Sequence, residues 1–337
     1  MTPSKRSSNP IEPSNKAGSE LGRRAAGAAA FLLGGVGAAQ LIRLVGNVVL
    51  TRLLFPEAFG LMGQVVVFLI GLHLFSDIGI GPSIVQSARG DDPKYLNTAW
   101  AIQIGRGTVL WLAGLAVAYP FAAFYEKPNL APLLLAASTT SLITGFQSTK
   151  INLAARNLNQ RSLAKLDLTS QAAGLVVTVS CAYAYRSVWA LVAGSLFADV
   201  VRVTLSHIVL PGPRNHFRYD SESARSLIRF GRWIFLSTVL TFLVSYSDRL
   251  IFPKLVDSAR FGIYQTGANI AALAPAVLSV LANHILFPVY SRILQSGGNL
   301  RGVFSDVRRP LLIAGGWALS GLAAGGPAAV HLLYDAR

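Results

Sequence analysis

The sequence predicts an all-α polytopic membrane protein with about nine transmembrane helices, arranged as a six-helix N-terminal lobe followed by the first three helices of a parallel-repeated second lobe. Three observations support this fold class. Apolar residues make up 52% of the 337-residue chain and charged residues only 13%, whereas soluble domains carry about 25% charged residues. Nine stretches are apolar and long enough to cross a bilayer, and one short motif occurs twice.

Each predicted span has close to the ~20 mostly apolar residues that a helix needs to cross the hydrocarbon core. The separators between spans carry turn or charge signals, such as Phe55-Pro56-Glu57 and Lys127-Pro128-Asn129. The nine predicted spans are 27–50, 61–85, 99–124, 130–149, 168–185, 188–210, 232–252, 261–289 and 310–333.

The positive charges predict how the chain is oriented. Of the 30 Lys and Arg residues, 20 fall in the N-terminal tail and the even-numbered loops, seven in the odd-numbered loops and at the C-terminal end, and three inside spans. Because cytoplasmic loops carry an excess of Lys and Arg, the N-terminus is predicted to be cytoplasmic. The net charge of +15 is therefore a topology signal. The basic residues form no stripe interleaved with aromatic residues, which excludes nucleic acid as a partner.

A short motif occurs in both halves of the chain. Arg52-Leu53-Leu54-Phe55-Pro56 precedes Phe59-Gly60-Leu61, and Arg249-Leu250-Ile251-Phe252-Pro253 precedes Phe261-Gly262-Ile263. Six spans separate the two copies, so both halves enter the membrane in the same direction. This predicts a parallel repeat about an axis along the membrane normal. Chance similarity between apolar hairpins is the alternative.

These features predict four regions: a disordered cytoplasmic tail (1–26), a six-helix lobe (27–210), a basic cytoplasmic linker (211–231) and an incomplete C-terminal lobe of three helices (232–337). The tail is rich in Ser, Pro, Asn, Lys and Arg. A cleaved signal peptide is disfavoured, because the apolar run after Arg24 continues past the length of such a peptide without a clear cleavage site. The second half stops after three spans, so either the chain is a fragment or it lacks what completes that lobe.

Polar residues inside the predicted spans indicate a hydrated cleft. Gln40, Arg43 and Asn47 recur at positions i, i+3 and i+7 of the first span and form one polar stripe. The seventh span, its repeat partner, carries a similar stripe that ends at Asp248. Charged groups inside a bilayer are costly and should face a cavity or the protein interior. Hydrogen bonding between helices is the alternative for the Ser and Thr residues.

A second polar group lies in the second and third spans. Asp77 and Arg106 are expected at similar depths and could form an ion pair, and His73 lies one turn from Asp77. The alternative is that Arg106 binds a phosphate while His73 and Asp77 handle a proton. The Gly79-Ile80-Gly81-Pro82 segment should weaken the second span near its inner end.

Two further polar features of the spans are expected to be structural. Asp199 and Arg202, spaced i, i+3, are expected to neutralise each other. His284, alone in the eighth span, is expected to be structural as well.

The sequence lacks several kinds of chemistry. It has no Walker A motif, no cluster of His and Cys at metal-ligand spacing, and a single cysteine, Cys181, which rules out a disulfide within the chain. The few carboxylates outside the spans form no convincing acid/base pair. We therefore expect no enzymatic activity, no cofactor and no metal.

Several segments resemble one family of transporters. Residues 51–61 (TRLLFPEAFGL), 75–81 (FSDIGIG) with 84–86 (IVQ), and 103–107 (QIGRG) are similar to the first three helices of Wzx-like polysaccharide flippases. These belong to the polysaccharide transporter family of the multidrug/oligosaccharidyl-lipid/polysaccharide exporter superfamily. The resemblance covers about residues 27–337, and the chain ends where family chains continue into further helices.

The resemblance implies two six-helix lobes around a cavity in a bacterial inner membrane, and movement of undecaprenyl-diphosphate-linked oligosaccharide by alternating access driven by an ion gradient. It implies that Arg43 and Arg106 meet the diphosphate. The residues expected in the diphosphate cavity are Arg43, Arg106, Gln40, Asn47 and Gln103, and those expected in ion coupling or gating are Asp77, His73 and Asp248. Membrane lipid, a polysaccharide polymerase and a chain-length regulator are the further partners implied.

Three alternatives remain at this point. An ion-coupled multidrug exporter would favour a strongly acidic lumen, which the intramembrane arginines disfavour. A membrane-embedded glycan polymerase or ligase would need a large periplasmic loop, and the sequence has none. A non-transporting partner of a polysaccharide synthesis complex is compatible with the short second half.

Overall fold

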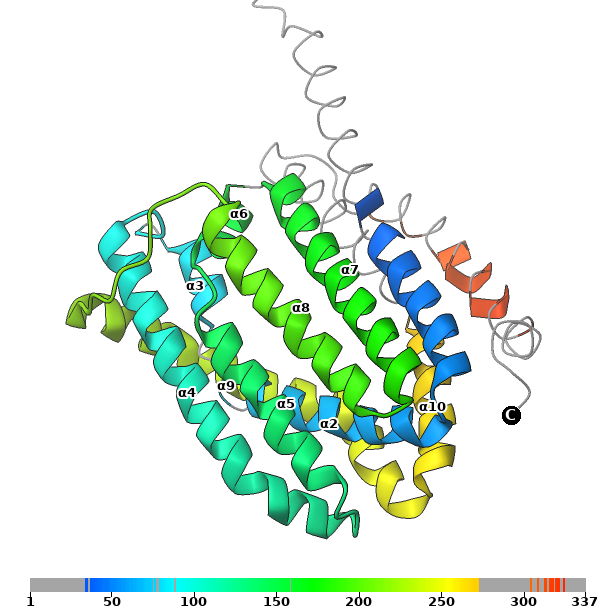
Figure 1. The fold of residues 1–337 in the computed structure, drawn as a ribbon. Helices are drawn as coiled ribbons and strands as arrows, with labels where there is room; N and C mark the ends of the chain where they lie inside the picture. The colour runs from blue at the N-terminus through cyan, green and yellow to red at the C-terminus, as the bar shows by residue number, and fades with distance from the viewer. Residues whose placement is uncertain are drawn as a thin grey trace, which may run out of the picture.

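The computed structural model describes residues 34–35, 37–74, 76, 79–87, 89–157 and 159–272, together with isolated positions between 304 and 324. Within these ranges the chain is helical throughout, as predicted, and has no strand (Figure 1). A helical segment spans 37–53. The helices that follow it are α2 (Pro56–Leu74), α3 (Ile80–Gln86), α4 (Pro93–Phe124), α5 (Leu130–Gly145), α6 (Lys150–Arg156), α7 (Gln160–Tyr185), α8 (Trp189–Ile208), α9 (Ser221–Leu255) and α10 (Ser258–Ala271).

Side-chain caps fix where the long helices begin. Asp92 accepts a hydrogen bond from the Lys94 backbone N–H at the start of α4, and Pro93 occupies the first helical position. Asn159 caps α7 in the same way, and Asp220 caps α9 by accepting from the Ser223 N–H at 2.9 Å. α9 therefore begins inside the segment predicted as a linker, and its 35 residues give a length of about 52 Å.

Two helices are interrupted where the sequence contains helix breakers or polar residues. α2 ends at Leu74 and α3 begins at Ile80, after Gly79 with φ of 61°, a left-handed conformation that glycine adopts at little cost. The weakening predicted at the Gly79–Pro82 segment is thus confirmed. α5 and α6 are separated by four residues and bend by 63°. Both breaks free backbone carbonyls, which need other partners.

Three described helices are long and apolar enough to cross a membrane: α2, α4 and α8. The bent pair α5 and α6 makes a fourth if it counts as one span. The predicted total of nine spans and the division into lobes stay predictions. The tail 1–26 lies outside the described residues, as does much of the spans predicted at 261–289 and 310–333.

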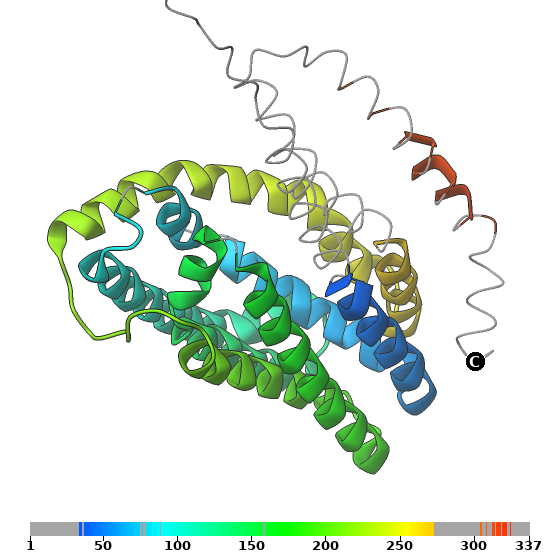
Figure 2. The same cartoon turned by 90° about the horizontal axis from the view of Figure 1, so that it is seen from above.

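The described helices form a bundle with two ends. Figure 1 shows the hairpins α4–α5 and α7–α8 side by side, and Figure 2 shows α9 curving along one side of the bundle. The "Glu126 end" comprises loops 54–55, 125–129, 186–188 and 256–257, and the "Arg89 end" comprises loops 87–92, 157–159 and 209–220.

Polar contacts connect α9 to the rest of the bundle at both ends. At the Glu126 end, the Tyr125 hydroxyl donates to the Leu250 carbonyl at 2.7 Å, and Lys254 Nζ lies 2.6 Å from Glu126 Oε1. This hydrogen bond and the charge of Lys254 lower the pKa of Glu126 below its usual value. At the Arg89 end, the guanidinium of Arg89 lies 3.1 Å from Glu222.

The two copies of the sequence repeat pack against each other through glycines. A Cβ atom added to Gly60 would lie 2.1 Å from the Ser258 carbonyl oxygen, and one added to Gly262 would lie 2.0 Å from the Pro56 carbonyl oxygen. Pro56 and Ser258, like Gly60 and Gly262, are 202 residues apart. The contact between α2 and α10 is therefore reciprocal, as a local twofold axis requires.

Candidate functional site: two polar cavities

Six of the eight predicted site residues line two separate cavities of the described structure. The larger one, of about 650 Å³, contains Gln40, Arg43 and Asn47. The smaller one, of about 350 Å³, contains His73, Gln103 and Arg106. We refer to them as the Arg43 cavity and the Arg106 cavity. Arg43 and Arg106, which are predicted to share one lumen, therefore lie in different cavities.

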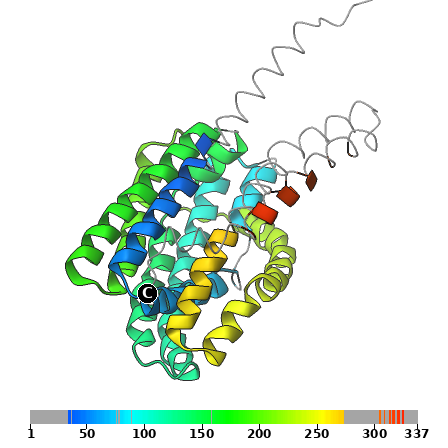
Figure 3. The same cartoon turned by 90° about the vertical axis from the view of Figure 1, so that its right-hand side faces the viewer.

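The Arg43 cavity lies between elements of both predicted lobes. Figure 3 shows segment 37–53 between the α7–α8 hairpin and α10. The predicted stripe of segment 37–53 lines one wall, Gln171 and Thr178 come from α7, and Arg202 and Ser195 come from α8. Asn269 of α10 completes the polar lining. α7 and α8 approach closely here. The glycine at position 194 permits this approach, since an added Cβ atom would lie 1.7 Å from the Thr178 hydroxyl oxygen.

Arg43 presents an uncompensated positive charge to this cavity. Its side chain is exposed, and Nε donates a weak hydrogen bond to Gln171 Oε1 at 3.4 Å. Among the described residues no carboxylate lies within ion-pair distance of its guanidinium. Guanidinium groups bind phosphate strongly because their planar donors match two oxygens at once. The site can therefore hold an anion that carries phosphate.

The second arginine of this cavity has a different partner from the one predicted. Arg202 Nη1 forms an ion pair with Asp167 of α7. Asp199, one turn before it on α8, instead accepts a hydrogen bond from the Thr140 hydroxyl of α5 at 3.0 Å. The prediction that Asp199 and Arg202 neutralise each other is wrong, because Arg202 forms its ion pair with Asp167 of the neighbouring helix α7.

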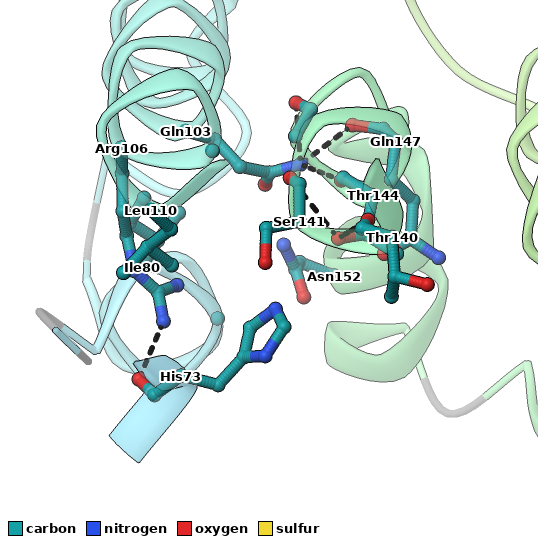
Figure 4. A pocket seen from close by; sticks show the side chains of 13 residues that line it. His73, Ile80, Gln103, Arg106, Leu110, Thr140, Ser141, Thr144, Gln147 and Asn152 are labelled. Atoms are coloured by element: carbon teal, nitrogen blue, oxygen red, sulfur yellow. Dashed lines mark hydrogen bonds between the residues drawn. The ribbon is translucent and has the colours of Figure 1, made fainter. Parts of the chain in front are cut away.

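The Arg106 cavity lies between the two helix breaks. Gln103 and Arg106 come from α4, Thr140, Ser141 and Thr144 from α5, and Asn152 from α6. Figure 4 shows the His73 ring and the Asn152 amide pointing into the space between α4 and α5. The cavity thus lies within the predicted N-terminal lobe.

Both side chains from α4 are engaged by the backbone at the helix breaks. Arg106 Nη2 donates to the His73 carbonyl at 2.8 Å and Nε donates to the Ser76 hydroxyl at 3.0 Å, at the end of α2. Gln103 Nε2 lies 2.9–3.2 Å from the carbonyls of Thr144, Gly145 and Gln147, at the end of α5. The His73 carbonyl also accepts from Ser76, and the Thr144 carbonyl from the Gln147 N–H. Arg106 and Gln103 therefore add donors at helix ends, where backbone carbonyls lack their usual intrahelical partners.

The residues predicted for ion coupling are separated as well. His73 Nδ1 donates to the Leu69 carbonyl at 2.9 Å, which turns Nε2 toward the cavity. Asp77 lies outside the described residues, so its predicted pairing with Arg106 stays a prediction, and His284 lies outside them too. Asp248 accepts a hydrogen bond from Tyr264 of α10 and lines neither cavity.

The lining of the cavities favours anions. Within the described ranges, neither wall includes an aspartate or a glutamate. The described residues also contain no cluster of three His, Cys, Asp or Glu side chains suited to a metal ion. The sequence analysis missed Gln171, Arg202 and Asn269 as lining residues. The i, i+3 spacing to Asp199 drew attention to Arg202, but nothing in the sequence indicated which helices would face each other.

Comparisons with known proteins identify relatives of the chain in polysaccharide biosynthesis. The chain is 24% identical over 263 residues to the lipopolysaccharide biosynthesis protein WzxC of Escherichia coli (strain K12), covering 77% of this chain and 52% of the relative. It is 21% identical over 255 residues to the succinoglycan biosynthesis transport protein ExoT of Rhizobium meliloti (strain 1021), covering 75% and 51%.

A third relative is named an uncharacterized membrane protein in the cps region of Klebsiella pneumoniae, and it is 20% identical over 259 residues, covering 75% of this chain and 53% of the relative. The chain thus spans about half the length of these relatives. No solved structure matches it.

The model of the family described as "Polysaccharide biosynthesis protein" matches residues 49–334. This range includes both copies of the repeat and most of the residues that line the two cavities. The resemblance stated from the sequence is therefore confirmed, and the chain belongs to the polysaccharide biosynthesis protein family.

Proposed function

We propose that the protein translocates a polyprenyl-diphosphate-linked oligosaccharide across the bacterial inner membrane, and that the Arg43 cavity receives the diphosphate. The observation that carries this proposal is the position of Arg43. It lies in the first predicted span, on the wall of a cavity of about 650 Å³, and has no carboxylate partner among the described residues. Such a charge is costly in lipid, so an anionic ligand offsets that cost.

The chemistry of the substrate explains the arrangement. A diphosphate and its sugars cannot cross hydrocarbon, whereas a polyprenyl chain can remain in lipid. A cavity with amide and hydroxyl groups beside one free guanidinium offers hydrogen bonds to both the phosphates and the sugars. The names of two relatives, which refer to lipopolysaccharide biosynthesis and to succinoglycan biosynthesis transport, support a glycan as the cargo.

The contacts at the Glu126 end support alternating access as the mechanism. On the proposed topology this end faces the periplasm. The α2–α10 glycine contact and the Lys254–Glu126 pair connect the two predicted halves at that end. Opening toward the periplasm would require these contacts to separate. A multidrug exporter for cations is disfavoured, because the described cavity walls carry arginine and no carboxylate.

The proposal is tested by replacing Arg43 with alanine in the organism's own polysaccharide pathway. R43A should abolish export of surface polysaccharide while membrane insertion and protein level stay normal. Arg52→Ala is the matched control, since Arg52 is exposed on the same helix and outside both cavities, and it should export normally.

Normal export by R43A would refute the assignment of the diphosphate site. Reconstitution with a labelled lipid-linked glycan separates the transporter from a non-transporting partner of a synthesis complex. That partner would leave the glycan on the side where it was added.

A further inference from the structure

Asp199 is an intramembrane carboxylate that neither the cavities nor the helix caps account for. It lies ten residues from Trp189, the first residue of α8, which at 1.5 Å per residue is about 15 Å. This is about the middle of a hydrocarbon core of about 30 Å. An ionisable side chain at this depth indicates function unless a partner neutralises it.

The surroundings of Asp199 favour a bound proton. Its hydrogen-bond partner in the described structure is the Thr140 hydroxyl, which donates to Oδ2 at 3.0 Å. No cation lies within ion-pair distance of it among the described residues. One hydroxyl donor does not offset the desolvation of an ionised carboxylate in a low-dielectric interior, whereas the neutral acid needs little compensation.

The charged groups on the elements packed against Asp199 are committed elsewhere or lie across a cavity. α5 carries no ionisable side chain between Leu130 and Gly145. Arg202 of the same helix pairs with Asp167 of α7.

The cations of α6 have partners of their own. Lys150 donates to a backbone carbonyl, and Arg156 pairs with Asp91. On α7, Arg161 and Lys165 lie in the first two turns, toward the Arg89 end.

Asp199 also lies between the two cavities. Thr140, its hydrogen-bond donor, lines the Arg106 cavity, whereas Ala198 and Arg202 on either side of it line the Arg43 cavity. An anion bound at Arg43 and Arg202 would therefore change the electrostatic field at this carboxylate.

We propose that Asp199 is a proton-binding site whose occupancy is linked to diphosphate binding in the Arg43 cavity. The inference rests on the proposed function. A diphosphate beside Arg202 adds negative charge and screens the guanidinium, and both effects disfavour the ionised carboxylate. Oδ1, the oxygen that Thr140 does not contact, then takes a proton from water. By linkage, the protonated protein binds the diphosphate more tightly than the ionised one.

The test is equilibrium binding of farnesyl diphosphate to the full chain in nanodiscs across a pH series. Wild-type affinity should fall as the pH rises, by up to about tenfold per pH unit. Asp199→Asn, which keeps the contact with Thr140 and cannot ionise, should bind as the wild type does at low pH and lose this dependence. Comparison at each pH removes the contribution from the probe's own ionisation.

Two further variants separate protonation from a merely structural role. Glu222→Gln removes an exposed carboxylate at the Arg89 end and should leave the wild-type pH profile unchanged. Thr140→Val removes the donor that stabilises the ionised form, so it should shift the midpoint of the profile toward higher pH.

If D199N binds the probe with the same pH dependence as the wild type, the proposal is overturned while the diphosphate site stands. If neither protein binds the probe at any pH, the proposed function and the proton site fail together.

Discussion

The two cavities contain the same kind of side chain in opposite situations. Arg106 donates to a backbone carbonyl and a hydroxyl at the end of α2, and Gln103 donates to the end of α5. Arg43 is exposed, and within the described part of the chain its guanidinium makes one long contact, with Gln171, whereas Gln40 makes no hydrogen bond there. The polar groups of the Arg106 cavity are thus used in contacts within the protein, whereas those of the Arg43 cavity are available to the proposed ligand.

This difference shows that an intramembrane arginine is not by itself a binding site. A helix break leaves carbonyls without partners, and a buried guanidinium can satisfy several of them at once. A structural arginine has most of its N–H donors bound to acceptors of the protein, whereas an arginine available to substrate has donors that are not used in this way. By that criterion Arg43 is the better candidate for the diphosphate.

The largest expected effect that separates the cavities is on stability. Replacing Arg106 with alanine removes the charge-assisted hydrogen bonds to the His73 carbonyl and the Ser76 hydroxyl, each worth about 1.5–3 kcal/mol. R106A should therefore unfold at a clearly lower temperature in detergent. R43A should unfold at the same temperature as the wild type. Equal losses of stability in the two variants would contradict the distinction between a structural Arg106 and a ligand-binding Arg43.

The glutamines provide a finer version of the same comparison. Gln103→Ala should lower the free energy of unfolding by about 1–2 kcal/mol, because it removes the side-chain donor of the Gly145 and Gln147 carbonyls at the α5 break. Gln40→Ala should change stability by less than about 0.5 kcal/mol but weaken binding of a prenyl diphosphate. Thermal unfolding and ligand binding, measured on both variants, check this. A destabilised Q40A with normal affinity would contradict it.

The smallest expected effect comes from the ion pair beside the Arg43 cavity. Asp167→Asn removes the carboxylate that neutralises Arg202, so the cavity becomes more positive. A partly exposed pair is worth about 1 kcal/mol or less. The affinity for a prenyl diphosphate should therefore rise by less than about tenfold. A decrease in affinity would mean that Asp167 positions Arg202 for the ligand.

Much of the fold could be predicted from hydropathy, but not the start of α9. The apolar runs and the Gly79 break each depend on residues close together in sequence, and the repeat is visible as two similar short motifs. The first turns of α9 are polar on one side and bury Ala224 and Leu227 on the other, a pattern that average hydropathy does not detect. Asp220 as the N-cap was the local signal that could have revealed it.

The composition of the candidate site was partly predictable, and its division was not. The position of each polar residue within its predicted span indicates its depth in the membrane, and six of the predicted residues do line cavities. Depth does not determine which helices are neighbours, so Arg43 and Arg106 were assigned to one lumen. Likewise, the spacing of Asp199 and Arg202 was a local preference that the packing of α7 against α8 overrides.

The most direct test of the account is a structure of the protein in a lipid nanodisc with bound undecaprenyl diphosphate. The account predicts that the phosphate oxygens lie within about 3 Å of the Arg43 guanidinium, while Arg106 keeps its contacts with His73 and Ser76. A diphosphate bound against Arg106, with Arg43 facing lipid tails, would contradict it.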